Sequence, residues 1–490
     1  MLQFDFASFL LGFIIAALLA ALLYRQRAAV AATRDRLAAS FQRLRERLTA
    51  NIESRYQAAL LAHLDRLHLA QNAAPFDALY VEQLLDAPPV RPSLTPPDAD
   101  VFNPVHFSVA LRSTRRLIIT SASGAGRTTA LSRMARLHVA RQAQARWGLD
   151  AERLPVLVNL PEVDWTIANE ANPLPALLDG ATAMLPRLIA VNAGRFISGR
   201  LRAASALLLL DGFDELTPAQ RLTCVSWLAA LLKLYPDTPI VIVTGSNGYG
   251  PLQNLGFAPL SLAKWTPAQI DDYAAKWVTV MKGGKQDRQL LSTGLRALSG
   301  LSPNPIDLAL AAGVWRATAT LPPNRAAVFE QWIDRALETD PAKARLTPDQ
   351  MKSICGRLAL TMFQQHRADF SFDELTQQVA AELPPATGDA ARQAEQAAEL
   401  AHEVIDRARI LTPFGVDGWG FVHRELAAFL AARHAAHTGQ PLGEYVSRPE
   451  WASVLDFHAA LIDPGELVSK QLAAADDLGR QQLWLAARWT

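Results

Sequence analysis

The sequence predicts an α/β fold in which a parallel sheet carries a ligand site at the carboxyl ends of its strands. One observation is the run 206–215, an apolar strand that ends in three carboxylates. The other is the run 117–129, a β-branched strand followed by small residues and a helix start. Continuous apolar strands are typical of parallel sheets that helices cover on both faces. Open sheets of this kind bind ligands beyond the carboxyl ends of their strands.

The acidic end of the strand 206–211 predicts a metal site. Asp211 should emerge where the strand ends, and Asp214 and Glu215 follow it directly. Because Mg²⁺ prefers oxygen ligands, we expect Asp211 to hold it and Asp214 and Glu215 to position an attacking water. Alternatively, the carboxylates only cap the next helix, for which Thr217-Pro218 is already a good start.

The small residues after the strand 117–120 predict a phosphate-binding loop. Backbone N–H groups at a helix start bind phosphate, and glycines let the backbone approach it closely. Thr128 keeps the hydroxyl group that Mg²⁺ needs. The predicted nucleotide-binding residues of this loop are Ser123, Gly124, Ala125, Gly126, Arg127, Thr128 and Thr129.

Two positions in this loop depart from the usual pattern, which opens with glycine and places lysine before Ser/Thr. Ser121 and Arg127 occupy those positions here. A guanidinium is wider and stiffer than an ammonium, so it does not simply replace lysine inside a wrapped loop. We therefore expect nucleotide affinity to survive and hydrolysis to be slow or absent. The alternative is a strand, loop and helix that bind nothing.

The two motifs, in this order, resemble the NACHT branch of the STAND signal-transduction NTPases, which are relatives of the AAA+ proteins. The resemblance covers most of the chain and implies a P-loop NTPase core, a helical lid and a winged-helix domain that bind ADP or ATP with Mg²⁺. Its further motifs are a second strand at 155–160, a sensor strand at 238–244, a Leu…Ile…Tyr element at 262–273, an Asn-Pro element at 301–306 and a Phe-x-His helix at 421–432.

The resemblance also implies roles for single residues outside the core. Pro305 would pack near adenine, although a proline can also simply start a helix. His423 would touch the β-phosphate of ADP and lock the resting state, although a lone histidine on a helix is often structural. The glutamate that family members carry in this helix is Ala428 here. Family members place an arginine after the sensor strand, where this chain has short residues at 245–248, which again predicts weak catalysis.

The N-terminus predicts one transmembrane helix. Residues 6–24 contain no charged side chain, and roughly 19 helical positions span about 28 Å, close to the hydrocarbon thickness of a bilayer. The alternative is a buried hydrophobic helix. The first charged residues after this run are arginines, so the positive-inside rule places the bulk of the protein in the cytoplasm. The only cysteines, Cys224 and Cys355, fit a reducing compartment.

Apolar residues recur at helical spacing from Val30 to Leu67 and predict a long amphipathic helix that ends at 72–75. It forms a short coiled coil or packs on its own NTPase core. The proline-rich run 86–98 predicts an extended linker. The predicted segments are 1–24 (transmembrane anchor), 25–75 (amphipathic helix), 76–105 (linker and lead-in), 106–260 (NACHT core), 261–345 (helical lid), 346–440 (winged helix) and 441–490 (start of a helical-repeat-like region).

Composition agrees with a protein of several domains. The chain has 490 residues, of which 50% are apolar, and that length predicts roughly three or four domains. The formal net charge of +1 offers no bulk reason to expect nucleic acid as a partner.

Three functions follow as hypotheses. The first is a membrane-anchored nucleotide switch that binds ADP or ATP with Mg²⁺ and forms homo-oligomers or recruits protein partners, by analogy with the family in defence or stress signalling. The second is a pseudo-NTPase scaffold that organises partners at the membrane without nucleotide. The third is an AAA+ motor with steady turnover, which the missing cationic residues disfavour.

Overall fold

The computed structural model describes residues 52–70, 73–87, 103–185, 187–299, 304–338, 345–383, 390–414 and 418–473, together with a few isolated positions. The predicted transmembrane run 6–24 lies outside these ranges, as does the linker from 88 to 98. Within the described ranges, no helix has the length and apolar character that a membrane crossing requires.

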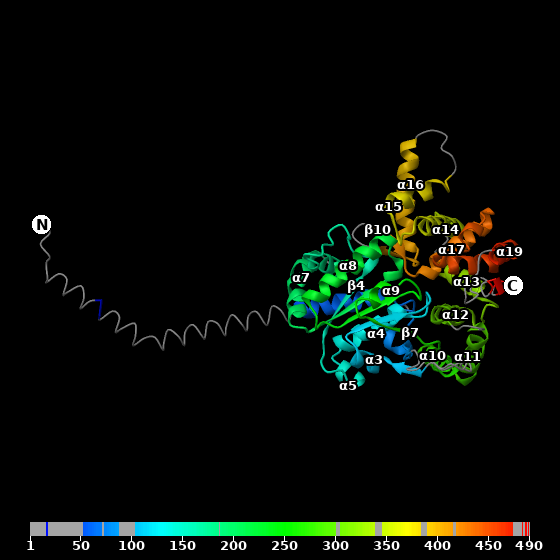
Figure 1. Ribbon diagram of the computed structural model, residues 1–490. Coiled ribbons are helices and arrows are strands. Elements are labelled where there is room, and N and C mark those ends of the chain that lie inside the picture. The colour runs from blue at the N-terminus through cyan, green and yellow to red at the C-terminus, as the bar shows by residue number, and fades with distance from the viewer. Residues whose placement is uncertain are drawn as a thin grey trace, which may run out of the picture.

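A seven-stranded sheet forms the first body of the molecule (Figure 1), in the order β2-β1-β7-β3-β6-β5-β4. The strands from β7 to β4 run parallel, whereas β1 is antiparallel to β2 and β7. The strand bounds are β1 Leu84–Ala87, β2 Asn103–His106, β3 Arg116–Thr120, β4 Leu154–Asn159, β5 Ala206–Asp211, β6 Ile240–Thr244 and β7 Ala258–Leu262. The predicted parallel α/β sheet is therefore confirmed.

Helices cover both faces of this sheet, with α7 and α8 on one side and α3, α4 and α5 on the other (Figure 1). Leu207–Leu210 of β5, which lies between β6 and β4, are accordingly no more than 2% exposed. The helix bounds in this body are α3 Phe107–Ser113, α4 Arg127–Val139, α5 Ala143–Trp147, α6 Leu174–Thr182, α7 Arg187–Arg202, α8 Pro218–Leu234 and α9 Gly250–Gln253.

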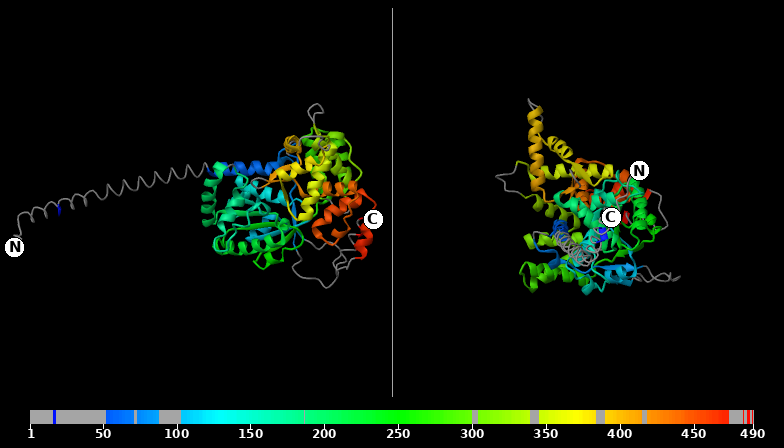
Figure 2. Two further views of the ribbon diagram at one scale, coloured as in Figure 1. Left: turned by 90° about the horizontal axis from the view of Figure 1, so that it is seen from above. Right: turned by 90° about the vertical axis from the view of Figure 1, so that its left-hand side faces the viewer.

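The helix over residues 52–66 lies along this body, as Figure 2 shows in blue. Its apolar face is buried in the core of the sheet through Tyr56, Leu60 and Leu64. The Tyr56 hydroxyl donates a hydrogen bond to the Pro155 carbonyl oxygen at 3.1 Å. The sequence left open a coiled coil or packing on the NTPase core, and residues 52–66 pack on the core.

Two expectations for the N-terminal segments are wrong. The helix ends at residue 66 rather than at 72–75, because the chain turns at residues 67–70. Asp86 and Ala87, expected in a linker, belong to β1 and extend the sheet by pairing with β2 and β7. Such pairing joins strands distant in sequence, so local composition does not reveal it. A short helix, α2 (Phe76–Leu79), precedes β1.

The second body is mostly helical and follows the sheet in the chain. A three-stranded antiparallel sheet, in the order β8-β10-β9, lies within it. Its elements are α10 Pro267–Val280, α11 Lys285–Ser299, α12 Pro305–Thr318, α13 Arg325–Leu337, α14 Pro348–Gln365, β8 Asp369–Ser371, α15 Phe372–Ala380, α16 Ala390–Arg407, β9 Leu411–Phe414, β10 Gly418–Phe421, α17 Arg424–Thr438, α18 Ala452–Leu461 and α19 Gly465–Ala473.

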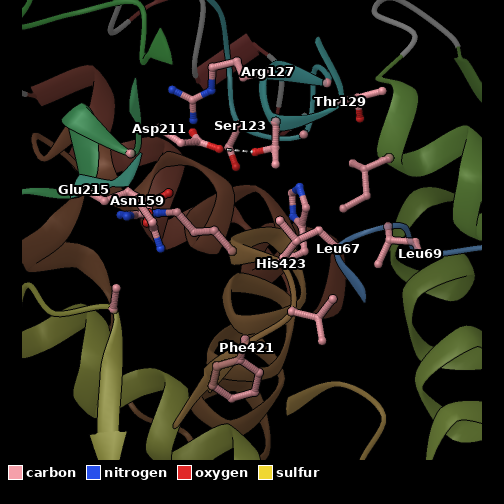
Figure 3. A pocket seen from close by; sticks show the side chains of 18 of the residues that line it. Leu67, Leu69, Ser123, Arg127, Thr129, Asn159, Asp211, Glu215, Phe421 and His423 are labelled. Carbon is pink, nitrogen blue, oxygen red and sulfur yellow. Dashed lines mark hydrogen bonds between the residues drawn. The ribbon is translucent and has the colours of Figure 1, made fainter. Parts of the chain in front are cut away.

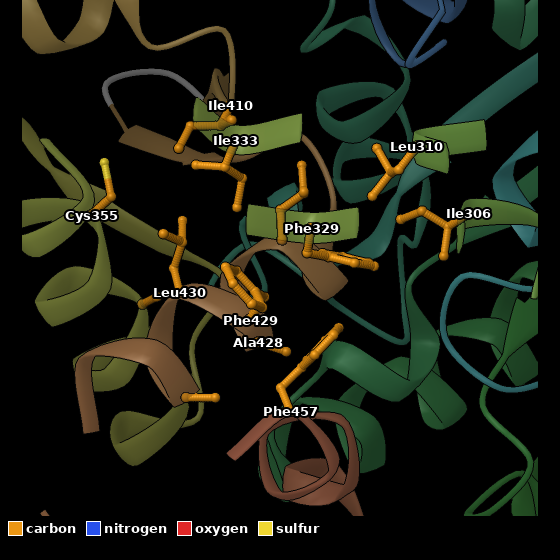
Figure 4. Close-up of a cluster of buried hydrophobic side chains, with 14 of the residues drawn as sticks. Ile306, Leu310, Phe329, Ile333, Cys355, Ile410, Ala428, Phe429, Leu430 and Phe457 are labelled. Carbon is orange, nitrogen blue, oxygen red and sulfur yellow. The ribbon is translucent and has the colours of Figure 1, made fainter. Parts of the chain in front are cut away.

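One apolar cluster joins α13, α17 and α18 (Figure 4). The rings of Phe329, Phe429 and Phe457 lie with centroids 4.7 to 5.8 Å apart. Ala428 is fully buried in the same cluster, so a glutamate at that position would place a carboxylate among aromatic rings. The small residue therefore fits the core of this helix.

Candidate nucleotide-binding site

The loop between β3 and α4 needs glycine at two positions. Gly124 and Gly126 have φ angles of 78° and 99°, which side-chain-bearing residues rarely adopt. A Cβ atom on Gly124 would lie 2.5 Å from Ile306 Cγ2, and one on Gly126 would lie 2.3 Å from Gln83 Nε2. Both conformation and crowding thus exclude larger residues.

Three hydrogen bonds clamp the loop from outside. Gln83 Nε2 donates to the Ala125 carbonyl at 3.0 Å, and Asn304 Nδ2 donates to the Ser123 carbonyl at 3.0 Å. The Ile306 N–H donates to the Gly124 carbonyl at 3.1 Å. Because these contacts use carbonyl groups, they fix the loop without consuming the N–H groups that a phosphate would need.

The first residues of α4 reach the acidic end of β5. Thr128 Oγ1 donates a hydrogen bond to Asp211 Oδ2 at 2.7 Å, and Arg127 forms an ion pair with Asp214 at 2.8 Å. Burial alone would lower the pKa of Arg127, but the carboxylates of Asp214 and Asp211 outweigh it and raise that pKa above its usual value. Arg127 is therefore a fixed cation in the site.

The carboxylates at this end are partly buried. Burial raises the pKa of Asp211, although the Thr128 hydroxyl opposes the effect. Burial also raises the pKa of Glu215 to about 7, against the charge of Arg424. The next helix, α8, is capped by Thr217 in a capping box with Gln220. The acidic residues do not provide its cap, so the capping explanation of this cluster is wrong.

His423 faces the loop from the second body. It is the N-cap of α17, and its Nδ1 accepts a hydrogen bond from the Glu425 N–H at 3.1 Å. Burial lowers its pKa to about 4, so the ring is neutral at pH 7 and carries its proton on Nε2. Figure 3 shows the ring pointing toward the loop between β3 and α4. The protonated Nε2 is therefore available as a hydrogen-bond donor on that side.

One cavity of about 520 Å³ unites these groups, within the usual size range of ligand pockets. The predicted residues that line it are Ser123, Gly124, Gly126, Arg127, Thr128, Thr129, Asp211, Asp214, Glu215, Pro305 and His423. Ala125 does not line it and packs against the core of the sheet instead. Pro305 starts α12 and lines the cavity, and its contact with adenine stays a prediction.

The sequence analysis did not predict several of the residues that line the cavity. Leu67, Val81 and Gln83 come from the segment before the core, and Arg221 and Arg424 add positive charge. Arg424 directly follows His423, and that adjacency could have marked it. Nothing in the sequence near Gln83 indicates its contact with the loop.

The donor set fits Mg²⁺ only together with a nucleotide. In the described part of the chain, no three His, Cys, Asp or Glu side chains come together as a metal cluster. Mg²⁺ commonly uses one or two protein ligands and completes its octahedron with phosphate oxygens and water. Thr128 and Asp211, already in contact, are the residues that would hold it.

The raised pKa of Glu215 predicts a pH effect on stability. Folded protein keeps the proton up to about pH 7, whereas an unfolded glutamate loses it near 4.5, so the contribution of Glu215 to stability falls as pH rises through that window. Relative to wild type, the Glu215→Gln variant should therefore gain about 3 kcal/mol of unfolding free energy between pH 4.5 and 8. Urea denaturation of the nucleotide-free protein at several pH values measures the free energy of unfolding of the variant and of the wild type. The exposed Glu395→Gln variant should show no such trend.

The strand order and the loop define a P-loop NTPase fold: β6 separates the loop strand β3 from the acidic strand β5, and residues after β3 and at the end of β5 line the cavity. No family model and no curated protein sequence matches the chain.

Among solved structures, the chain is similar to a STAND protein with a tetratricopeptide repeat sensor from Pyrococcus horikoshii, at 12% identity and a TM-score of 0.33, over 78% of this chain and 56% of that one. It is also similar to the Aeropyrum pernix ORC1 protein in complex with DNA, at 14% identity and a TM-score of 0.32, over 66% and 89%. Since these TM-scores are below 0.5, we base the class on the strand order and the loop themselves.

Proposed function

We propose that the protein is a NACHT/STAND-type nucleotide switch that binds ADP or ATP with Mg²⁺ and hydrolyses ATP slowly or not at all. The observation that carries this proposal is the convergence of the loop, the acidic end of β5, Pro305 and His423 on one cavity. These groups come from two bodies of the chain. A ligand between them therefore favours the arrangement in which it contacts both.

In this proposal α10–α13 are the helical lid and α14–α17 the winged-helix domain. The loop N–H groups and the start of α4 hold the phosphates, and Thr128 and Asp211 hold Mg²⁺. Pro305 packs near the base, and His423 donates to the β-phosphate. Asp214 and Glu215 are the candidates for positioning water. Release of ADP opens the two bodies and exposes surfaces for homo-oligomers or other protein partners.

Nucleotide content after gentle purification tests this function. Denaturing the protein and chromatographing the supernatant should reveal ADP at close to one equivalent. An empty site that also fails to bind added MgADP or MgATP would contradict the proposal.

The runner-up function is a pseudo-NTPase scaffold, and one contact favours it. The Arg127–Asp214 ion pair satisfies two charges of the site without any ligand. Under both proposals ATPase activity should be near background, because Arg127 is held by a carboxylate and residues 245–248 provide no arginine. Steady multiple-turnover hydrolysis would instead favour a motor.

We also propose that residues 6–24 anchor the protein in a membrane with its bulk in the cytoplasm. This proposal rests on the uncharged run and the arginines after it. The full-length protein should stay in the membrane pellet during alkaline carbonate extraction, and a chain without residues 1–51 should not. Release of the full-length form by carbonate would contradict the anchor.

A further inference from the structure

The segment directly after β6 carries no cation that could serve a third phosphate. Residues 245–248, which follow β6, are Gly, Ser, Asn and Gly. A Cβ atom on Gly245 would lie 3.0 Å from Asp214 Oδ2, so the end of β6 approaches the acidic cluster closely. A nucleoside triphosphate brings further negative charge to this cluster of carboxylates, and that charge needs a counter-charge.

Two of the arginines in the cavity are already engaged there. Arg127 is paired with Asp214 at 2.8 Å. Arg221 donates a hydrogen bond to the Asp214 carbonyl oxygen at 2.6 Å. Both guanidinium groups therefore hold the turn after β5 in place.

Arg424 is placed differently. It is the first residue of α17, directly after His423, and it lines the cavity together with Glu215. Its guanidinium carbon lies 5.1 Å from the centroid of the Phe363 ring, which supports it through a cation–π contact. Among the residues that the structure describes, no carboxylate forms an ion pair with it.

The start of α17 thus presents two donors of different kinds. The His423 ring points toward the phosphate-binding loop (Figure 3), where the inner phosphates of a nucleotide bind. Arg424 supplies a full charge one residue further on, and its field acts on Glu215 at the acidic end of β5. The backbone N–H groups at this helix start add partial positive charge.

We infer that Arg424 binds the terminal phosphate of a nucleoside triphosphate, supplying from α17 the charge that the end of β6 lacks. The inference rests on the proposed nucleotide site. Its consequence is that the preference for triphosphate over diphosphate is set by the second body rather than by the sheet. Because Arg424 is on α17, movement of this helix would change the relative affinity for triphosphate and diphosphate.

Binding measurements on the full-length protein, freed of endogenous nucleotide, test the inference. The ligands are MgADP and a magnesium complex of the non-hydrolysable triphosphate AMP-PNP. Arg424→Gln should raise the Kd for AMP-PNP about 10- to 100-fold, the usual range for a lost hydrogen bond to a charged group. Its Kd for ADP should change less than about threefold. Arg424→Lys keeps the charge and should retain most of the preference.

The control is Arg409→Gln, which removes the same charge from an exposed position outside the cavity and should leave both Kd values unchanged. Equal weakening of both nucleotides by Arg424→Gln, or no weakening, would overturn the inference while leaving the nucleotide site intact. Failure of the wild type to bind either nucleotide would overturn both. If Arg424→Gln does not fold, loss of the triphosphate preference in Arg424→Lys would count against the inference.

Discussion

Replacing Arg325 with methionine is expected to lower the free energy of unfolding by about 3 to 5 kcal/mol, the usual cost of leaving a buried charge without its partner. Arg325 forms ion pairs with Asp307 at 2.9 Å and with Glu425 at 2.6 Å. The Glu425 side chain is only 1% exposed. Arg325 also stacks over Phe457, at 4.2 Å from the ring centroid. Urea denaturation at pH 7 measures the loss.

The position of this ion pair makes the effect more than local. Asp307 lies two residues after Pro305, and Glu425 lies two residues after His423. The Glu425 N–H also donates to His423 Nδ1. Arg325 therefore ties together two walls of the cavity, and nucleotide affinity should fall along with stability.

Arg345→Met is the matched control. Arg345 also pairs with two carboxylates, Glu399 at 2.8 Å and Glu403 at 3.1 Å, but its side chain is 53% exposed. Glu403 keeps its ion pair with Arg407 at 2.7 Å, and exposed ion pairs contribute about 0 to 1 kcal/mol each, so this variant should lose little. An equally small loss for Arg325→Met would show that the buried pair is not what holds α12, α13 and α17 together.

Removing the His423 donor is expected to speed ADP release about 10- to 100-fold, because a hydrogen bond to a charged phosphate contributes about 1.5 to 3 kcal/mol. His423→Asn is the sharpest variant. Asparagine remains a good N-cap for the Glu425 N–H but is too short to reach the phosphate. Stopped-flow release of a fluorescent ADP measures the rate, and the open or oligomeric fraction should rise with it.

His423→Leu separates the two roles of this residue. It removes both the phosphate donor and the N-cap, so it should release ADP like His423→Asn and also lose about 1 kcal/mol of stability without nucleotide. His437→Leu, an exposed position on the same helix, should do neither. If His423→Asn releases ADP at the wild-type rate, His423 does not hold the nucleotide.

Local features of the fold followed from the sequence. The apolar runs at 117–120, 155–159 and 207–210 lie within strands β3, β4 and β5, because short continuous apolar runs have few other ways to be buried. The glycines at 124 and 126 have the positive φ angles that a wrapped loop requires. The helix starts at Thr217-Pro218 and Asn304-Pro305 also lie where their residues predicted them.

Other features depended on pairings that no local pattern encodes. Strand β1 is short, polar in part and next to a proline-rich run, so its place in the sheet comes from β2 and β7. The reason for a small residue at Ala428 is the aromatic cluster that surrounds it, which the sequence does not reveal. The positive charge that residues 245–248 lack is brought into the cavity by Arg221 and Arg424, from two other helices.

The sequence by itself determined the glycine-containing loop after β3, the acidic end of β5 and the histidine at the start of α17, because backbone freedom, burial and capping are decided by neighbouring residues. Only the tertiary structure decided how these groups meet. Gln83 reaches the loop across 42 residues and Asn304 across 181. The Gln83 contact depends on how β1 joins the sheet, and the Asn304 contact depends on how the two bodies pack.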